Sequence, residues 1–294
     1  MDLTPNITDT ALVFEGGGMR GAYSAAVVTG LLEAGLHFSH VCGISAGGSH
    51  TANYLSRAPE RARRSFVDFA ADPRFGSWRT WLQGKGLFNA EYIYQQCWLP
   101  GGPLPFDFAT FQANPATFSI GAFDAVAGQT VYWGRDQVQR PIDLMVRIRA
   151  SSTIPIVMPP VTLGGRLWYD GALGTNGGIP LDAAQTAGFR RFFVVLSRQR
   201  SYVKPPAHGR TALAWKFRRY PDVVDGIMDR PANYNRVRQE LFDLEAAGQA
   251  YVFCPGQVTL TNHTTDVAQL QAAYDQALAQ AKAELPRWRD FLGR

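Results

Sequence analysis

Two glycine-rich turns near the start of the chain constrain its fold and its chemistry more than any other feature. The first turn, Gly16-Gly17-Gly18, follows a short apolar run that ends at Phe14. The second, Gly43-Ile44-Ser45-Ala46-Gly47, follows another such run, and a helical stretch separates the two. Glycine adopts backbone conformations that other residues avoid, so each turn predicts a sharp change from strand to helix. We expect the first turn to bind negative charge and the second to expose a serine.

The alternation of apolar runs and helical stretches continues and predicts an α/β fold. Further strands are expected at residues 116–124, 129–134, 161–169, 191–197 and 251–254. Helices are expected at residues 51–69, 144–151, 181–187 and 266–285, the last ending before Pro286. This alternation is typical of a mostly parallel sheet that helices cover on both faces. No break in composition divides the chain. We therefore expect one domain over residues 1–294, with a motif-bearing core at about 10–195 on which residues 196–294 pack.

Composition excludes several classes of protein. Hydrophobic residues make up 46% and charged residues 18% of the 294, so the chain can bury a large core. Cys42, Cys97 and Cys254 are far apart and form no CxxC pair, which favours a reducing compartment. The N-terminus lacks the features of a secretory leader, and no run of about 18 apolar residues predicts a spanning helix. We expect a cytoplasmic protein whose net charge of +5 suits a peripheral contact with the anionic inner membrane surface.

The spacing Gly16-x-Gly18-x-x-Gly21 formally matches a dinucleotide-binding fingerprint. That fingerprint also needs an acidic residue at the end of the second strand, and residues 37–45 contain none. A P-loop is excluded because no GK[ST] follows. The turn can still direct successive N–H groups at one point, next to the positive end of a helix. It can therefore stabilise a phosphate or a developing oxyanion, and Arg20 is close enough in sequence to add charge. A turn whose glycines serve packing alone is the simpler alternative.

The second turn, Gly43-x-Ser45-x-Gly47, has the pattern of a nucleophile elbow. In such an elbow the change from strand to helix lifts the serine oxygen out of the sheet, and glycines prevent backbone clashes. β-type residues before the turn and small residues after it agree with this interpretation. The alternative is an ordinary helix cap at Ser45.

A serine nucleophile needs a base, and the sequence offers two candidates. Asp170 ends a predicted strand in WYDGA, beside Gly171, where backbone can approach a neighbouring loop. A carboxylate within about 3 Å can take the serine proton directly. His263, in TNHTTD, is the histidine that best suits a Ser-His arrangement. We favour Asp170 as the base and His263 as a polar loop residue, although an Asp-Gly pair also occurs in plain turns.

Taken in order, these elements resemble the patatin-like phospholipase family, which carries G-G-G-x-R-G, then G-x-S-x-G, then D-G-[GA]. The counterparts here are GGGMRG at 16–21, GISAG at 43–47 and DGA at 170–172. Residues 150–160, ASSTIPIVMPP, are similar to the family's A-S-x-A-x-P-x-x-F-P-P and depart from it at Ile154 and Met158. The resemblance covers about residues 10–195 and points to the compact bacterial cytoplasmic branch.

The resemblance implies a three-layer α/β/α fold and hydrolysis of lipid acyl esters through a Ser-Asp dyad. Ser45 would be the nucleophile and Asp170 the base, with no cofactor and no metal. The resemblance assigns the oxyanion hole to Gly16, Gly17, Gly18 and Arg20. It assigns support of the turns to Gly21, Gly43, Gly47 and Gly171. An acyltransferase or thioesterase with the same dyad, and a catalytically silent lipid-binding protein, are the alternatives.

Two further segments bear on the substrate. Residues 72–111 contain many large apolar side chains: Phe75, Trp78, Trp81, Leu82, Leu87, Phe88, Trp98, Leu99, Phe106, Phe108 and Phe111. We expect a lid or an acyl-chain pocket there, an ordinary core being the alternative. Residues 190–219 hold nine Lys/Arg and no Asp/Glu, interleaved with aromatics, which suits anionic lipid headgroups or a solvated surface. No nucleic-acid-binding module accompanies this run, so no nucleic-acid partner is expected.

Overall fold

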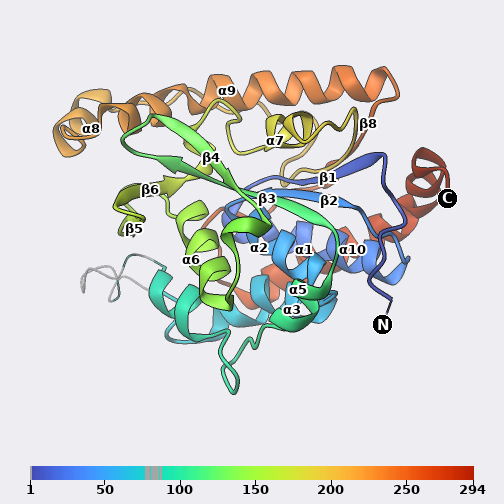
Figure 1. The fold of residues 1–294 in the computed structure, drawn as a ribbon. Helices are drawn as coiled ribbons and strands as arrows, with labels where there is room; N and C mark the ends of the chain where they lie inside the picture. The colour runs from blue at the N-terminus through green and yellow to red at the C-terminus, as the bar shows by residue number, and fades with distance from the viewer. Residues whose placement is uncertain (1, 77–79, 81–85, 87) are drawn as a thin grey trace.

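The residues that the structure describes form a mixed eight-stranded sheet with helices on both sides (Figure 1). The computed structural model describes residues 2–76, 80, 86 and 88–294. The strands are β1 (Thr10–Phe14), β2 (His40–Ile44), β3 (Thr117–Asp124), β4 (Gln129–Trp133), β5 (Val161–Leu163), β6 (Arg166–Asp170), β7 (Arg191–Val195) and β8 (Ala250–Phe253). Their order is β5-β6-β3-β2-β1-β7-β8, with β4 paired to β3. The five strands β3-β2-β1-β7-β8 pair in parallel, while β4, β5 and β6 join antiparallel. The predicted α/β class with a mostly parallel sheet is confirmed.

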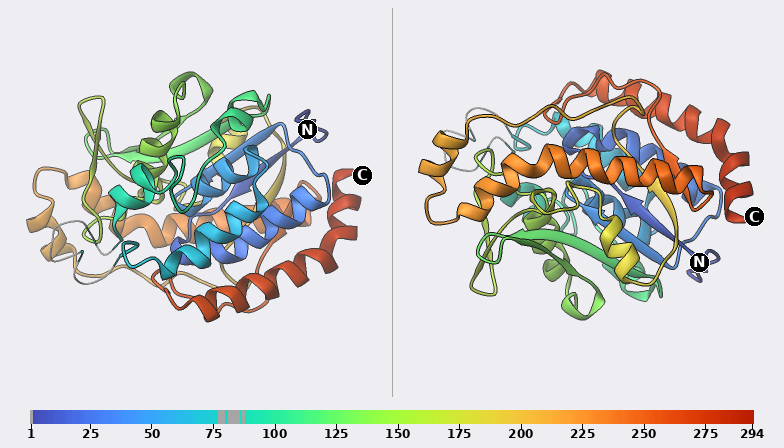
Figure 2. Two further views of the ribbon diagram at one scale, coloured as in Figure 1. Left: turned by 90° about the horizontal axis from the view of Figure 1, so that it is seen from below. Right: turned by 90° about the horizontal axis from the view of Figure 1, so that it is seen from above.

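Helices cover the sheet in two unequal layers. They are α1 (Gly21–Glu33), α2 (Ala46–Leu55), α3 (Pro59–Phe66), α5 (Phe108–Ala113), α6 (Pro141–Ser151), α7 (Leu181–Thr186), α8 (Arg210–Lys216), α9 (Pro221–Ala246) and α10 (Val267–Leu292). Helices α7 and α9 lie on one face, and α1, α2, α3, α5, α6 and α10 lie on the other (Figures 1 and 2). In the described part of the chain, no helix is both long and apolar enough to cross a membrane.

The alternation of side chains along the central strands explains why the core has two layers. Successive side chains of a strand point to opposite faces of a sheet. Leu12 and Phe14 of β1 belong to the buried cluster beneath α1, whereas Ala11 and Val13 belong to the cluster beneath α7 and α9. All of β1 is buried, as is usual for a parallel strand covered on both sides.

Helix α10 returns the C-terminus to the first layer. It packs on α1, where the Tyr274 hydroxyl donates a 3.0 Å hydrogen bond to Thr29 Oγ1. The predicted end before Pro286 is wrong, because α10 runs through this proline to Leu292. Proline removes one backbone hydrogen bond, but the following turn is held by fully buried Trp288, whose ring meets Phe193 edge-on at 5.2 Å. This shared core supports our proposal that the chain forms a single domain.

Candidate active site

Strand β3 determines which residues meet at the centre of the molecule. It pairs with β2 in parallel, with Ile44 opposite Gly121, and with β6 antiparallel, with Asp170 opposite Ala122. Both strands lie on the same edge of β3, because β4 occupies the other edge along the same residues. Since Gly121 and Ala122 are neighbours, β2 and β6 meet end to end. Ser45, which follows Ile44, is thereby brought to Asp170.

Ser45 occupies a strained turn between β2 and α2. Its φ of 57° and ψ of −124° lie outside the regions that a serine ordinarily adopts. Its N–H donates to Ser151 Oγ at 2.8 Å, and the Ser151 hydroxyl donates to the carbonyl of Gly121 at 2.6 Å. Ser151 thus ties the turn to β3 and holds its strained conformation. Sequence reasoning assigned no role to Ser151, although it lies in the stretch 150–160 that resembles the family.

The glycines around Ser45 are required by close backbone contacts. A Cβ atom on Gly43 would lie 2.2 Å from the carbonyl oxygen of Gly47, and one on Gly47 would lie 2.3 Å from the carbonyl oxygen of Phe14. On Gly171, beside Asp170, a Cβ atom would lie 2.4 Å from the carbonyl oxygen of Gly121. Real Cβ atoms do not approach backbone so closely. These positions therefore allow β2, α2 and β6 to converge.

Adjacent glycines of α2 offer a direct test of this packing. Gly47→Ala is expected to lower the free energy of unfolding by about 3 kcal/mol, since the clash is with backbone that cannot move aside. Gly48→Ala is the matched control: its Cβ would approach no atom closer than Ile120 Cγ2, at 3.4 Å, which is ordinary van der Waals contact, and alanine favours helix. Urea unfolding of the two variants measures the difference. Equal stability of the two would contradict the role given to Gly47.

The first glycine turn offers free backbone donors beside Ser45. In the described part of the chain, the N–H groups of Gly17 and Gly18 have no hydrogen-bond acceptor. Gly18 has a φ of +56°, which favours glycine, and lines the same cavity as Ser45. The expectation for Gly16 is corrected, because its N–H already donates to the carbonyl of Gly178 at 2.9 Å. Gly16 shapes the turn, and Gly17 and Gly18 keep donors available.

Arg20 does not line the cavity that holds Ser45. Only 3% of it is exposed, and its Nε donates to Ser197 Oγ at 3.3 Å, at the end of β7. Burial lowers the pKa of Arg20 to about 10, although the negative charge of Glu15 raises it. The expected donation by Arg20 to an oxyanion is therefore replaced by an anchoring contact. The adjoining Gly21 packs beneath Phe66, whose ring would lie 2.5 Å from a Cβ atom there.

The environment of Asp170 favours a carboxylate that can accept a proton. Asp170 is 5% exposed, and burial raises its pKa above the ordinary 3.8. The charges of Arg230 and Lys204 act in the opposite direction and lower this pKa. The backbone N–H of Ala172 donates to Asp170 Oδ1 at 2.9 Å, and the neighbouring Ser45 side chain also lowers the pKa of the carboxyl group. A buried carboxyl group with a raised pKa, next to a serine, is a candidate general base.

The histidines lie elsewhere. His263 is exposed and stacks on Phe88 with 5.7 Å between ring centroids. It makes no hydrogen bond to Ser45 or Asp170 among the described residues. His50, one turn into α2, is fully buried and stacks on Phe66 at 4.4 Å. Within the described ranges, no group of three or more His, Cys, Asp or Glu side chains is arranged to hold a metal.

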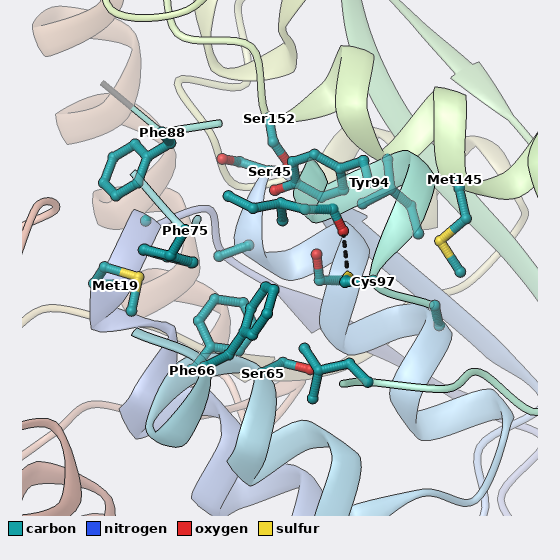
Figure 3. A pocket seen from close by; sticks show the side chains of 18 of the residues that line it. Met19, Ser45, Ser65, Phe66, Phe75, Phe88, Tyr94, Cys97, Met145 and Ser152 are labelled. Atoms are coloured by element: carbon teal, nitrogen blue, oxygen red, sulfur yellow. Dashed lines mark hydrogen bonds between the residues drawn. The ribbon is translucent and has the colours of Figure 1, made fainter. Parts of the chain in front are cut away.

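An apolar cavity opens beside Ser45 (Figure 3). Ser45, Ser152 and Tyr94 lie together at one side of it, and Phe66, Phe75 and Phe88 contribute aromatic walls. The remaining apolar lining is Met19, Ala46, Ala52, Phe69, Ile93, Cys97, Leu104, Met145, Ile148, Ile154 and Met158. Sequence reasoning missed Tyr94, which lies beside Ser45 and Ser152 (Figure 3) and whose pKa burial raises.

The apolar segment 72–111 contributes to this cavity only in part. Phe75 and Phe88 line it, whereas Phe111, on α5, is fully buried in the core. The predicted residues Trp78, Trp81, Leu82 and Leu87 lie outside the described residues. Asn262 was not predicted either. Its carbonyl accepts the N–H of Met19 at 3.1 Å, so a loop near the C-terminus closes over the first glycine turn.

Curated relatives match about three fifths of this chain. An uncharacterized NTE family protein of Mycobacterium tuberculosis is 29% identical over 186 residues, which cover 60% of this chain and 45% of the relative. The uncharacterized protein YjjU of Escherichia coli is 25% identical over 189 residues, covering 63% of this chain and 51% of YjjU. The chain therefore spans about half the length of the curated relatives it matches.

Structure and family comparisons agree with these matches. The crystal structure of VipD from Legionella pneumophila superposes with a TM-score of 0.51 and 11% sequence identity, covering 95% of this chain and 67% of VipD, so the two share a fold. A domain family of unknown function (DUF6363) matches residues 220–293, which contain α9, β8 and α10. The profile of the patatin-like phospholipases matches residues 12–184, more than half of the chain and both glycine turns with Asp170. The chain therefore belongs to the patatin-like phospholipase family.

Proposed function

We propose that the protein is a serine lipid acyl hydrolase that cleaves acyl esters through a dyad of Ser45 and Asp170. One observation carries the proposal: the register of β3 joins the strained Ser45 turn to a buried carboxyl group with a raised pKa. The free amides of Gly17 and Gly18 and the apolar cavity lie at the same place. Nucleophile, base, oxyanion donors and acyl-chain site are the parts that acyl transfer needs.

The reaction would proceed in two halves. The Ser45 hydroxyl attacks the ester carbonyl, its proton passes to Asp170, and the amides of Gly17 and Gly18 donate to the oxyanion. Collapse of this intermediate expels the alcohol, which takes the proton from Asp170 and leaves an acyl group on Ser45. Water then attacks the acyl-enzyme and gives its proton to Asp170. The fatty acid leaves, and Asp170 returns the proton to Ser45. Loss of one oxyanion donor costs about 3 kcal/mol in the barrier.

A panel of short-chain substrates tests this function. Wild-type protein and Ser45→Ala would be incubated with dihexanoyl lipids and a hexanoyl thioester, with and without glycerol as an acyl acceptor. We expect wild type to release hexanoic acid from esters and Ser45→Ala to release none. Faster transfer to glycerol than to water would favour an acyltransferase, and preference for the thioester would favour a thioesterase. Binding without turnover of any substrate would favour a silent lipid-binding protein.

The raised pKa of Asp170 predicts the acid side of the pH profile. Asp170 must be unprotonated to accept the serine proton, so kcat/KM should fall as the pH drops through a midpoint above 3.8. Arg230→Gln removes a positive charge that lowers this pKa, so the midpoint should move to higher pH. Arg236→Gln, on the same helix, is the matched control, because Arg236 acts on Asp182 instead. Hydrolysis of a neutral ester would be followed, and an unmoved midpoint in Arg230→Gln would contradict Asp170 as the titrating base.

A further inference from the structure

Four basic side chains lie close to one another, and two of them, Arg230 and Lys204, also act on Asp170. Arg20 follows the first glycine turn, Arg198 and Lys204 belong to the segment after β7, and Arg230 lies on α9. Their charges act on one another: Arg198 and Arg230 lower the pKa of Arg20, and Arg230, Arg20 and Arg198 lower that of Lys204. Burial, the larger cause, brings the pKa of Lys204 to about 8. Such mutual repulsion within a partly buried cluster needs a compensating anion.

The protein does not supply enough negative charge itself. In the described part of the chain, none of the four cations forms a salt bridge. Glu15 is the nearby acid that acts on Arg20 and Lys204, and its carboxylate already accepts the N–H of Ser197 at 2.5 Å and the hydroxyl of Tyr234 at 2.9 Å.

Several donors of the cluster are also unused. Arg20 Nη1, Arg198 Nε and Arg230 Nε are buried and have no hydrogen-bond partner among the described residues. Arg20 is 97% buried, since 3% of it is exposed. Unsatisfied buried donors on like charges are costly to the folded protein, and such features concentrate where a ligand binds.

The position of the cluster relates it to the dyad. The charges of Arg230 and Lys204 reach Asp170 and lower its pKa, while none of the four cations lines the apolar cavity. The cluster therefore lies outside the cavity, with two of its members close enough to act on Asp170. A molecule with its acyl chain in the cavity and its ester at Ser45 would direct its alcohol portion toward the cluster. Guanidinium groups match the geometry of phosphate oxygens, and four cations would repel a quaternary ammonium group.

We propose that Arg198, Lys204 and Arg230, backed by Arg20, form a headgroup site that selects acyl esters carrying a net-negative phosphate over zwitterionic and neutral ones. This proposal rests on the proposed function, because a preference among acyl esters shows in catalysis only if the protein hydrolyses them. Its physical basis is the binding of an anion by cations that form no salt bridge among the described residues, although Arg198 lies over the ring of Tyr202 at 4.3 Å and Lys204 over that of Tyr234 at 4.7 Å. The site would contribute specificity, whereas the chemistry would stay with Ser45 and Asp170.

Short-chain lipids that remain monomeric separate headgroup binding from attachment to a membrane surface. Dihexanoyl phosphatidic acid, dihexanoyl phosphatidylcholine and dihexanoylglycerol share acyl chains and differ in headgroup charge. The ratio of kcat/KM for phosphatidic acid to that for the glyceride should fall roughly tenfold to a hundredfold in the double variant R198Q/K204Q. The control R218Q/R219Q removes two exposed charges from the same basic run and should keep the wild-type ratio. An unchanged ratio in R198Q/K204Q, or a wild-type preference for phosphatidylcholine, would overturn the proposal.

Binding and stability keep the proposal testable if no substrate turns over. Calorimetry would follow dihexanoyl phosphatidic acid binding to Ser45→Ala, alone and combined with R198Q/K204Q. We expect binding to Ser45→Ala that weakens at least tenfold in the combined variant; no binding, or equal binding, would overturn the headgroup site while leaving the hydrolase proposal standing. Inorganic phosphate that binds as tightly as the lipid would assign the cluster to free phosphate and also overturn it. R198Q/K204Q should melt at a higher temperature than wild type without ligand, because repulsion is relieved, whereas a purely structural cluster would lose stability.

Discussion

Ser45→Ala is expected to abolish ester hydrolysis and labelling by a fluorophosphonate probe. The substitution removes the oxygen that forms the acyl-enzyme, and loss of a serine nucleophile lowers kcat by about 10⁴-fold or more. The folded state should change little, because the contacts that hold the turn are made by the Ser45 backbone N–H with Ser151. Labelling would be read by intact-protein mass spectrometry, and hydrolysis by release of fatty acid.

Ser56→Ala is a matched control for this experiment. Ser56 is buried at the end of α2, but its hydroxyl donates to the carbonyl of Asn53 at 3.2 Å, away from the cavity lining. This variant should be labelled and hydrolyse esters like wild type. Full esterase activity in Ser45→Ala would reject the mechanism. Labelling at another serine would assign the nucleophile to that residue.

Asp170→Asn is expected to lower kcat by about 10²- to 10⁴-fold, the usual contribution of a general base. Asparagine has nearly the same shape and can still accept the N–H of Ala172, so the loss would report on proton transfer. His263→Ala should keep activity, because His263 stacks on Phe88 and makes no hydrogen bond to Ser45 among the described residues. The opposite pair of results would favour a Ser-His mechanism.

Asp170→Asn should also change the stability of the folded protein. Burial raises the pKa of Asp170 in the folded state above 3.8, so the folded protein holds the proton more tightly than the unfolded chain does. The ionised carboxylate therefore destabilises the folded state. This destabilisation grows as the pH rises from 3.8 to the raised pKa, persists at higher pH, and is absent below pH 3.8. Asp170→Asn should increase the free energy of unfolding at neutral pH. Urea unfolding at neutral pH would distinguish a stable but inactive variant from a misfolded one.

The sequence predicts best where neighbouring residues decide the structure. The turns at 16–18 and 43–47 have short apolar runs before them and small residues after them, so local geometry alone implies strand, turn and helix. Glycine at positions 43 and 47 indicates close backbone contacts that a residue with a Cβ atom would not allow. The alternation of strands and helices follows from hydrophobic period, which is also local.

Features that depend on contacts distant in sequence were missed or incorrectly predicted. The engagement of Gly16 by Gly178 depends on a turn after β6, and the anchoring of Arg20 depends on the end of β7. The extension of α10 beyond Pro286 depends on buried packing of Trp288, which outweighs the local preference of proline. Helix α9 was not predicted because Pro231 lies inside it, and there too buried packing outweighs the local preference of proline.

Ser45 and Asp170 show most clearly which features follow from the sequence and which depend on the tertiary structure. The α/β class, the sharp turn at the serine and the candidates for the base could be predicted from sequence, because each depends on a few adjacent residues. The tertiary structure was needed to show that β2 and β6 bring Ser45 to Asp170, that the amides of Gly17 and Gly18 have no acceptor among the described residues, and that Arg230 and Lys204 act on the carboxylate. The reason is physical: these arrangements follow from the pairing register of β3 and the packing of α9, which bring together residues far apart in the chain.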